Sequence, residues 1–103
     1  MSKYFLHGSL NAIEGKGGEL ADLLLEASQL VADAKGCSLY LISIDEKVPE
    51  TVWVTEVWDS KDDHENSLKI EVVRSLISKA VPLLAGQPQR GHELSFLGGH
   101  GIS

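Results

Sequence analysis

The four histidines are the side chains of this chain that gain and lose a proton most readily near neutral pH. His64 lies in a helical segment that follows Glu56 and Trp58, which close a strand-like run. Glu56 and Trp58 are two positions apart, so they point to the same face of a strand, and the Glu56 carboxylate could orient an inward-facing imidazole. These residues predict a catalytic group made of His64, Glu56 and Trp58.

A second interpretation of His64 follows from the acidic run around it. Asp62, Asp63 and Glu65 are its neighbours, and on a solvated helix face they would simply raise the pKa of the imidazole. Trp58 also has a structural alternative, because aromatic residues in strands usually belong to the core. The direction in which His64 points decides between the two interpretations.

His7 and His92 fall on the first and last predicted strands, which are neighbours in a ferredoxin-like sheet. A metal site would need a third ligand, and Glu93 points away from His92 on an alternating strand, so we expect no metal. Together with Asn11 and Tyr40, the two histidines are candidate substrate-binding residues. The alternative is that these polar groups are satisfied at a sheet edge or at a subunit interface.

Composition excludes several classes of function. The chain has 103 residues, 43% of them apolar, which fits one domain over residues 1–103. Nine Lys and Arg against fifteen Asp and Glu give a net charge of −6, which disfavours nucleic acids and anionic membrane surfaces. The single Cys37 excludes an internal disulfide and a paired-cysteine metal site, and it fits a cytoplasmic location. No apolar run approaches the roughly 20 residues of a membrane span.

The spacing of apolar residues predicts the elements that would position these side chains. Alternation indicates strands, three- and four-residue spacing indicates helices, and Ser60 followed by Asp63 is typical of a helix start. The glycine-rich residues 97–103 are expected to form a flexible tail. The predicted elements are strands over residues 4–12, 37–45, 51–59 and 89–97, a helix over residues 16–35, and a second helical region from Ser60 to a kink or end near Pro82.

This order, βαββαβ, is that of the α+β ferredoxin-like fold, in which two helices cover one face of a four-stranded antiparallel sheet. The strands over residues 37–45 and 51–59 are apolar on both faces, so the face without helices needs a cover. A chain of this length leaves no further layer to provide it. We therefore expect a homodimer whose sheets face each other.

The pattern VTEVWDSKDDHENSL, from Val54 to Leu68, resembles the strand-to-helix signature of the antibiotic biosynthesis monooxygenase family. In that family a Glu-x-Trp strand end is followed by a Ser-initiated helix that carries a histidine. The resemblance covers almost the whole chain. It implies a dimeric α+β barrel in which each protomer holds a pocket between sheet and helices.

The resemblance also implies a function. Some members oxygenate phenols, quinols or anthrones with O2 and without a metal or flavin, so we expect a cofactor-independent monooxygenase in which His64 accepts the phenolic proton. Ser67 and Ile77 stand where the haem-degrading branch has a tryptophan and a histidine, which argues against haem degradation. The alternatives are a small-molecule binding protein, or an isomerase or lyase, of the same fold. An RNA-recognition domain would need glycine and basic residues that the strand over residues 51–59 lacks.

Overall fold

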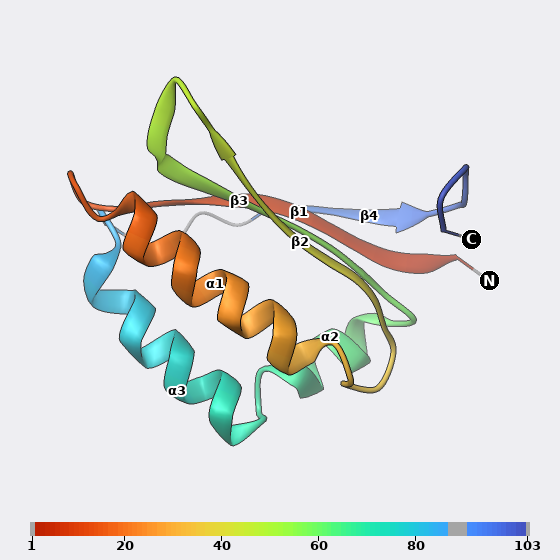
Figure 1. Ribbon diagram of the computed structural model, residues 1–103. Coiled ribbons are helices and arrows are strands. Elements are labelled where there is room, and N and C mark those ends of the chain that lie inside the picture. Colours follow the sequence, from red (N-terminus) through yellow and green to blue (C-terminus); the bar gives the residue numbers. More distant parts are fainter. Residues whose placement is uncertain (1, 87–90, 103) are drawn as a thin grey trace.

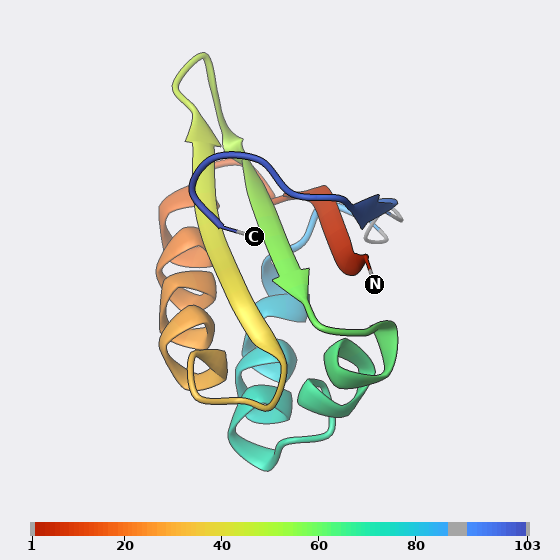
Figure 2. The ribbon, with the colours of Figure 1, turned by 90° about the vertical axis from the view of Figure 1, so that its right-hand side faces the viewer.

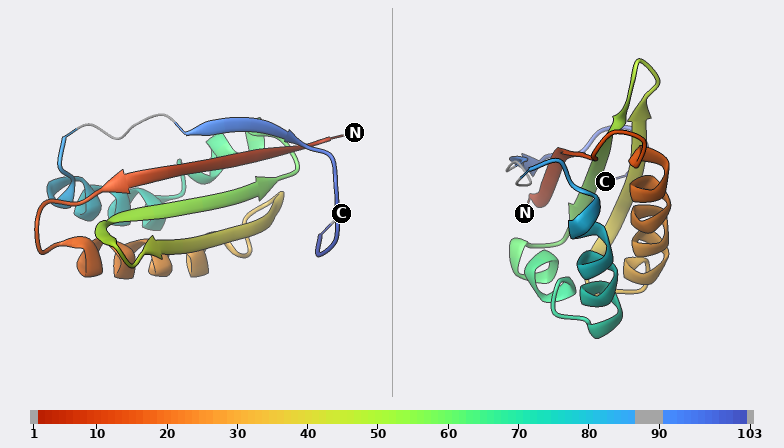
Figure 3. Two further views of the ribbon diagram at one scale, coloured as in Figure 1. Left: turned by 90° about the horizontal axis from the view of Figure 1, so that it is seen from above. Right: turned by 90° about the vertical axis from the view of Figure 1, so that its left-hand side faces the viewer.

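A four-stranded antiparallel sheet carries the helices on one of its faces (Figures 1 and 3). The computed structural model describes residues 2–86 and 91–102. The strand order is β2-β3-β1-β4, so the predicted ferredoxin-like βαββαβ arrangement is confirmed. The elements are β1 (Lys3–Asn11), α1 (Gly17–Val31), β2 (Cys37–Asp45), β3 (Val48–Trp58), α2 (Lys61–Ser67), α3 (Glu71–Ala80), the short 3-10 helix η1 (Val81–Leu83) and β4 (His92–Phe96).

The helices bury the inner face of the sheet, which we define as the face that carries Val52, Glu56 and Trp58. Two apolar clusters hold the layers together. Near one end Leu20 of α1 packs with Val52 of β3, and near the other Val31 of α1 packs with Trp58 and with Val73 of α3. Burying one such Leu or Val stabilises the fold by roughly 1.5–3 kcal/mol. The two clusters fix the helices at both ends of the sheet and leave space between them.

The outer face of the sheet is also apolar, as the sequence predicted. Leu41 of β2 and Leu94 of β4 are 52% and 55% exposed, and Trp53 of β3 is half-buried beside them. The strand pairing places Leu41, Leu94 and Trp53 on the same face of the sheet, opposite the helices. The sheet therefore presents a large apolar surface on the side opposite the helices.

Helix α1 ends at Val31 and not at Lys35 as predicted. The residues after it form tight turns, in which the Ala34 amide donates to the Val31 carbonyl and the Cys37 amide to the Ala34 carbonyl. Gly36 has a φ of 83°, and a Cβ there would meet the Asp63 side chain. Ala34 of this turn packs on the cluster that contains Trp58. Its apolar side chain continued the three- and four-residue spacing of α1, so the sequence pattern predicted a longer helix.

The second helical region is split in two, which the sequence did not predict. The Ser60 hydroxyl accepts a hydrogen bond from the Asp63 amide at 3.1 Å, so the predicted helix start is confirmed. Helix α2 then stops at Ser67, and Ile70 adopts an extended conformation before α3 begins. The predicted end near Pro82 is confirmed, because α3 stops at Ala80 and Pro82 lies in η1. Among the described residues, no helix combines the length and the apolar character that crossing a bilayer requires.

The hairpin between β2 and β3 is tighter than predicted. β3 begins at Val48, and Asp45 pairs with Val48 around Glu46 and Lys47, so Pro49 lies within the strand and not in the connection. The pairing of β1 with β3 reaches only to Thr51. Pro49 is therefore beyond the end of β1, on the projecting arm seen in Figure 2, where its missing N–H costs no hydrogen bond to a neighbouring strand.

The last strand is shorter than the predicted residues 89–97. β4 covers His92–Phe96, and residues 89 and 90 lie outside the described part of the chain. After β4, Leu97 is 91% exposed. The flexibility expected of the tail over residues 97–103 stays a prediction.

Candidate functional site

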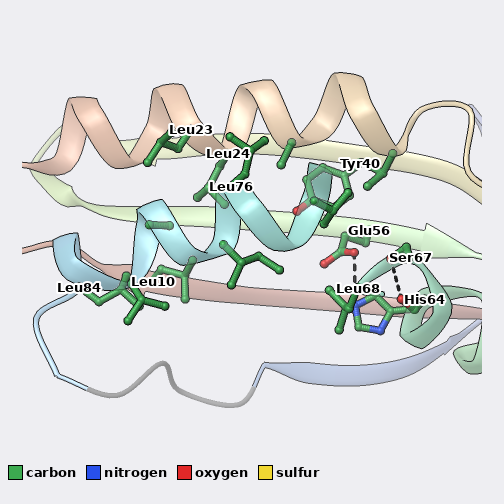
Figure 4. Close-up of a pocket in the computed structure, with 16 residues that line it drawn as sticks. Leu10, Leu23, Leu24, Tyr40, Glu56, His64, Ser67, Leu68, Leu76 and Leu84 are labelled. Carbon is green, nitrogen blue, oxygen red and sulfur yellow. Dashed lines mark hydrogen bonds and ion pairs between the residues drawn. The ribbon is translucent and has the colours of Figure 1, made fainter. Parts of the chain in front are cut away.

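A cavity of about 420 Å³ lies between the helices and the inner face of the sheet (Figure 4). We call it the main cavity. Its walls are aliphatic side chains from α1, α3, η1, β1 and the residues directly after α2 and η1, apart from four residues that carry polar groups. These four are Tyr40, Glu56, His64 and Ser67, and Figure 4 shows them gathered at one end.

His64 points inward from α2 into this polar end. Its side chain is 12% exposed, and its Nε2 lies 3.6 Å from Oε1 of Glu56. The rings of Tyr4 and Trp58 contact the imidazole at centroid distances of 5.5 and 5.8 Å, and the Ser67 hydroxyl donates to the His64 carbonyl at 2.6 Å. Nδ1 of His64 is buried, and among the described residues it has no hydrogen-bond partner.

Glu56 is a buried carboxyl on β3, with an exposed side-chain fraction of 8%. Its Oε1 accepts a hydrogen bond from the indole Nε1 of Trp58 at 3.0 Å. Burial raises the pKa of Glu56 to about 7, and the hydrogen bond from Trp58 opposes that rise. Glu56 is thus itself suited to take and return a proton at neutral pH.

Burial has the opposite effect on His64. It lowers the pKa of the imidazole, while Glu65 and Glu93 act to raise it and Lys61 to lower it. The interpretation of His64 as a solvated residue with a raised pKa is therefore wrong. Because the carboxyl resists losing a proton and the imidazole resists gaining one, both groups favour their uncharged forms, with the proton on Glu56.

Tyr40 lies beside this pair, since β2 and β3 pair Tyr40 with Glu56. Its phenol extends into the main cavity (Figure 4). Burial and the charge of Glu56 raise the pKa of Tyr40 above its ordinary value. The hydroxyl therefore stays protonated and can donate a hydrogen bond to an anionic ligand oxygen.

Trp58 lies behind the cavity wall. It is fully buried, and its polar contact is the hydrogen bond that it donates to Glu56. Its position fits a residue that orients Glu56 more than one that touches a substrate. Trp53, in contrast, faces outward and stacks on His7 with 5.1 Å between ring centroids, so the predicted opposite directions of the two tryptophans are observed.

The structure separates His7, His92 and Asn11 from the main cavity. His7 and His92 are paired across β1 and β4, as predicted, but on the outer face, where Nδ1 of His7 lies 2.9 Å from the Thr55 hydroxyl. The Asn11 side chain accepts a hydrogen bond from the Thr51 hydroxyl on the same face. A substrate in the main cavity does not reach these three residues, because alternate residues of a strand point to opposite faces.

Tyr4 is a neighbour of the site that sequence reasoning missed. Its ring contacts His64, and its hydroxyl donates to Oε1 of Glu93 at 3.2 Å. Lys61 of α2 lies 3.6 Å from the same oxygen. Tyr4 pairs with Trp58 across β1 and β3, and this pairing would have placed Tyr4 beside the site. The sequence alone does not provide the register of β1 against β3.

Within residues 2–86 and 91–102, no group of three or more His, Cys, Asp or Glu side chains is arranged to hold a metal. The expectation of a metal-free site stays a prediction.

Comparison with known proteins shows the family of this chain. The family model for antibiotic biosynthesis monooxygenases matches residues 4–77. A crystal structure from Chloroflexus aurantiacus, provisionally described as an antibiotic biosynthesis monooxygenase, is 36% identical, with 99% of this chain and 100% of that chain covered and a TM-score of 0.87. The chain belongs to the antibiotic biosynthesis monooxygenase family.

More distant structures share the fold. A Deinococcus radiodurans protein with the same provisional description is 26% identical over 97% of this chain and 96% of that chain, with a TM-score of 0.73. A conserved protein from Methanosarcina mazei is 12% identical over 93% of this chain and 94% of that chain, with a TM-score of 0.82. No curated protein matches the chain.

Proposed function

We propose that this protein is a monooxygenase that uses O2 without a cofactor on a small phenol, quinol or anthrone held in the main cavity. The single observation that carries the proposal is the Glu56 and His64 pair. Both groups stand at the polar end of a cavity whose other walls are aliphatic, and burial raises the pKa of Glu56 while it lowers that of His64. Titratable groups perturbed in this way are enriched at catalytic sites.

The chemistry needs a base, a donor and a dry space. The Glu56 carboxylate, or the imidazole of His64, removes the proton from the substrate hydroxyl, and Tyr40 donates a hydrogen bond to the resulting anion. The electron-rich anion transfers an electron to O2, and the two radicals combine to form a carbon-bound peroxide. Loss of water from this peroxide breaks its O–O bond and the C–H bond at the same carbon and leaves a new C=O bond, so one oxygen atom enters the product and the other leaves as water.

The pair can return the proton that this last step consumes. Protonated Glu56 delivers it to the leaving peroxide oxygen, and the carboxylate is regenerated. Aliphatic walls exclude water and favour the uncharged quinone product over the charged intermediates. Trp58 is proposed to hold Glu56 in place throughout.

A second candidate function is supported by the same pKa of Glu56. A carboxylate with a pKa of about 7 in an apolar cavity also suits proton abstraction beside a carbonyl, as in an isomerase or lyase. Such a reaction would proceed in the absence of O2, whereas the proposed oxygenation would stop.

We further propose that the protein is a cytoplasmic homodimer. The outer face supports the dimer, because it exposes large apolar side chains such as Leu41 and Leu94 and would be covered by a second copy. The single free Cys37 supports a reducing compartment.

An oxygen electrode tests the proposed activity. Protein treated with a chelator should consume one O2 per molecule of anthrone or naphthoquinol converted, and Glu56→Gln should consume it at least tenfold more slowly. Conversion that continues unchanged under argon would contradict oxygenation and favour the isomerase or lyase.

A further inference from the structure

The main cavity is elongated, with its polar groups at one end. Figure 4 shows Glu56 and His64 at that end and Leu10 and Leu84 at the other. Leu10 pairs with Val52, which is four residues before Glu56 on β3. At about 3.3 Å per residue the two ends are roughly 13 Å apart. A single aromatic ring would fill only the polar end.

The two ends also differ in the kind of side chain. The ring-bearing residues of the lining, Tyr40 and His64, stand at the polar end, and the remainder of the cavity is lined by Leu, Val, Ile and Ala side chains. A flat polycyclic ligand would find ring faces to stack on at one end only. A flexible alkyl chain would contact aliphatic carbon along the whole length.

A second space opens beside the main cavity, and we call it the side hollow. It has a volume of about 240 Å³ and shares Tyr40 and Glu56 with the main cavity. In the floor of the side hollow, Gly8 of β1 lies against Gly91, the residue before β4. A Cβ on Gly8 would lie 2.9 Å from the Cα of Gly91, so this close approach leaves no space for a side chain. Leu68 and Ile77, 39% and 42% exposed, border both spaces. The side hollow therefore adjoins the main cavity along shared lining residues, which are Leu10, Leu24, Tyr40, Glu56, Leu68 and Ile77.

We propose that the substrate is an amphipathic phenol or quinol, whose ring lies between Tyr40 and His64 and whose unbranched alkyl tail of about six to ten carbons runs to Leu10 and Leu84. The ring position rests on the proposed function. The tail site rests on the shape and lining of the main cavity alone.

The tail length follows from two estimates. An extended chain advances about 1.2 Å per bond, so roughly 13 Å minus the length of the ring leaves space for about six carbons. An apolar cavity of about 150 Å³ holds one benzene, about 25 Å³ per carbon, so 420 Å³ holds roughly seventeen heavy atoms, equivalent to a phenol with about ten tail carbons. The two estimates place the longest tail that the main cavity can hold between about six and about ten carbons.

Titration calorimetry under argon with para-alkylphenols of two to twelve tail carbons tests the proposal. Each methylene should lower Kd by about fourfold until the far end is reached, and the gain should stop between about six and ten carbons. A Kd that does not depend on tail length would overturn the proposal. A Kd that keeps falling to twelve carbons without a break would also overturn it, because it would indicate adsorption outside a bounded cavity.

Variants at the far end locate the tail. Leu84→Phe should move the break to shorter tails by two to four carbons, and Leu84→Ala should move it to longer ones. Leu25, which is 49% exposed on α1 and outside the cavity lining, provides the matched controls Leu25→Phe and Leu25→Ala, whose break should equal that of the wild type. If circular dichroism shows that Leu84→Phe is unfolded, Val81→Phe at the half-exposed Val81 of the same wall should shorten the limit instead.

These binding measurements do not require turnover. A chain-length break without O2 consumption would support the tail site while contradicting the monooxygenase. O2 consumption without any dependence of Kd on chain length would support the monooxygenase while contradicting the tail site.

Discussion

Oε1 of Glu56 receives the indole N–H of Trp58 at 3.0 Å and lies 3.6 Å from Nε2 of His64. The same oxygen of Glu56 therefore contacts both the fully buried Trp58 and the imidazole of His64, which faces the main cavity. Burial raises the pKa of the carboxyl and lowers that of the imidazole. Both groups therefore favour their uncharged forms in this wall.

The raised pKa of Glu56 predicts a pH-dependent stability. The native carboxyl has a pKa of about 7 against an ordinary value of 4.5, so the native state binds more protons than the unfolded state between these pH values. The contribution of Glu56 to the free energy of unfolding should therefore fall as pH rises from 4.5 to 7, by up to roughly 3 kcal/mol, while the lowered pKa of His64 contributes the opposite slope below 6.5. Urea unfolding of Glu56→Gln should lack this fall. Parallel curves for wild type and variant across pH 4.5–8 would show that the carboxyl is not perturbed.

His64→Ala should slow O2 consumption at least tenfold, because it removes an imidazole proposed to accept the substrate proton. His100→Ala is a matched control in the exposed tail and should retain the wild-type rate. The rates are compared at saturating substrate with an oxygen electrode. Equal rates for both variants would remove His64 from the proposed mechanism.

Trp58→Phe should shift the pH profile of kcat/KM. The hydrogen bond from Trp58 lowers the pKa of Glu56, and a hydrogen bond to a charged group is worth about 1.5–3 kcal/mol, or roughly one to two pKa units. The variant should therefore reach half of its maximal rate at a pH about one to two units higher. Trp53→Phe, on the outer face, should keep the wild-type midpoint. A lower rate with an unmoved midpoint would indicate that Trp58 only supports the fold.

Tyr40→Phe should separate binding from turnover. Loss of the hydroxyl removes the donor to the substrate anion and should lower kcat by about 10-fold to 100-fold, in line with other anion-stabilising donors. The Kd of a neutral alkylphenol should change by less than about threefold, since the ring and its packing remain. A loss confined to Kd would assign Tyr40 to binding alone.

The outer face should form the dimer. Leu41→Glu and Leu94→Glu place charge on its exposed apolar positions and should yield monomers at micromolar concentration, as measured by sedimentation velocity. Val72→Glu, at a position of α3 that is 52% exposed on the helical side, should remain dimeric. A wild-type chain that sediments as a monomer would contradict the proposed dimer.

The fold was predictable because its signals are local. The alternation around Trp53 and Trp58 gave the faces of β3, and Ser60 with Asp63 marked the start of α2. The ends of elements were less predictable. The turn after Val31 continues the apolar spacing of α1, because Ala34 packs on the Trp58 cluster. The break between α2 and α3 near Ile70 contains no proline or glycine, so the sequence there does not indicate a helix end.

The site was predictable in part. Glu56 and His64 could be identified by type and position, whereas the assignment of His7 and Asn11 to substrate binding lacked the register that sets which strand face lies under the helices. The opposite direction of the two pKa shifts, up for Glu56 and down for His64, could not be predicted either. It arises from burial, which depends on the packing of α1 and α3 over β3 and has no sequence signature of its own.

Isotope labelling of the product tests the central proposal most directly. Metal-free protein, an alkylquinol of eight tail carbons and 18O2 in ordinary water are combined, and the product is analysed by mass spectrometry after reduction to block oxygen exchange. We predict one 18O atom per product molecule from the wild type and at least tenfold less labelled product from Glu56→Gln in the same time. Product without 18O, or equal labelling by both proteins, would contradict the assignment of Glu56 and His64 as the acid-base pair of an oxygenase.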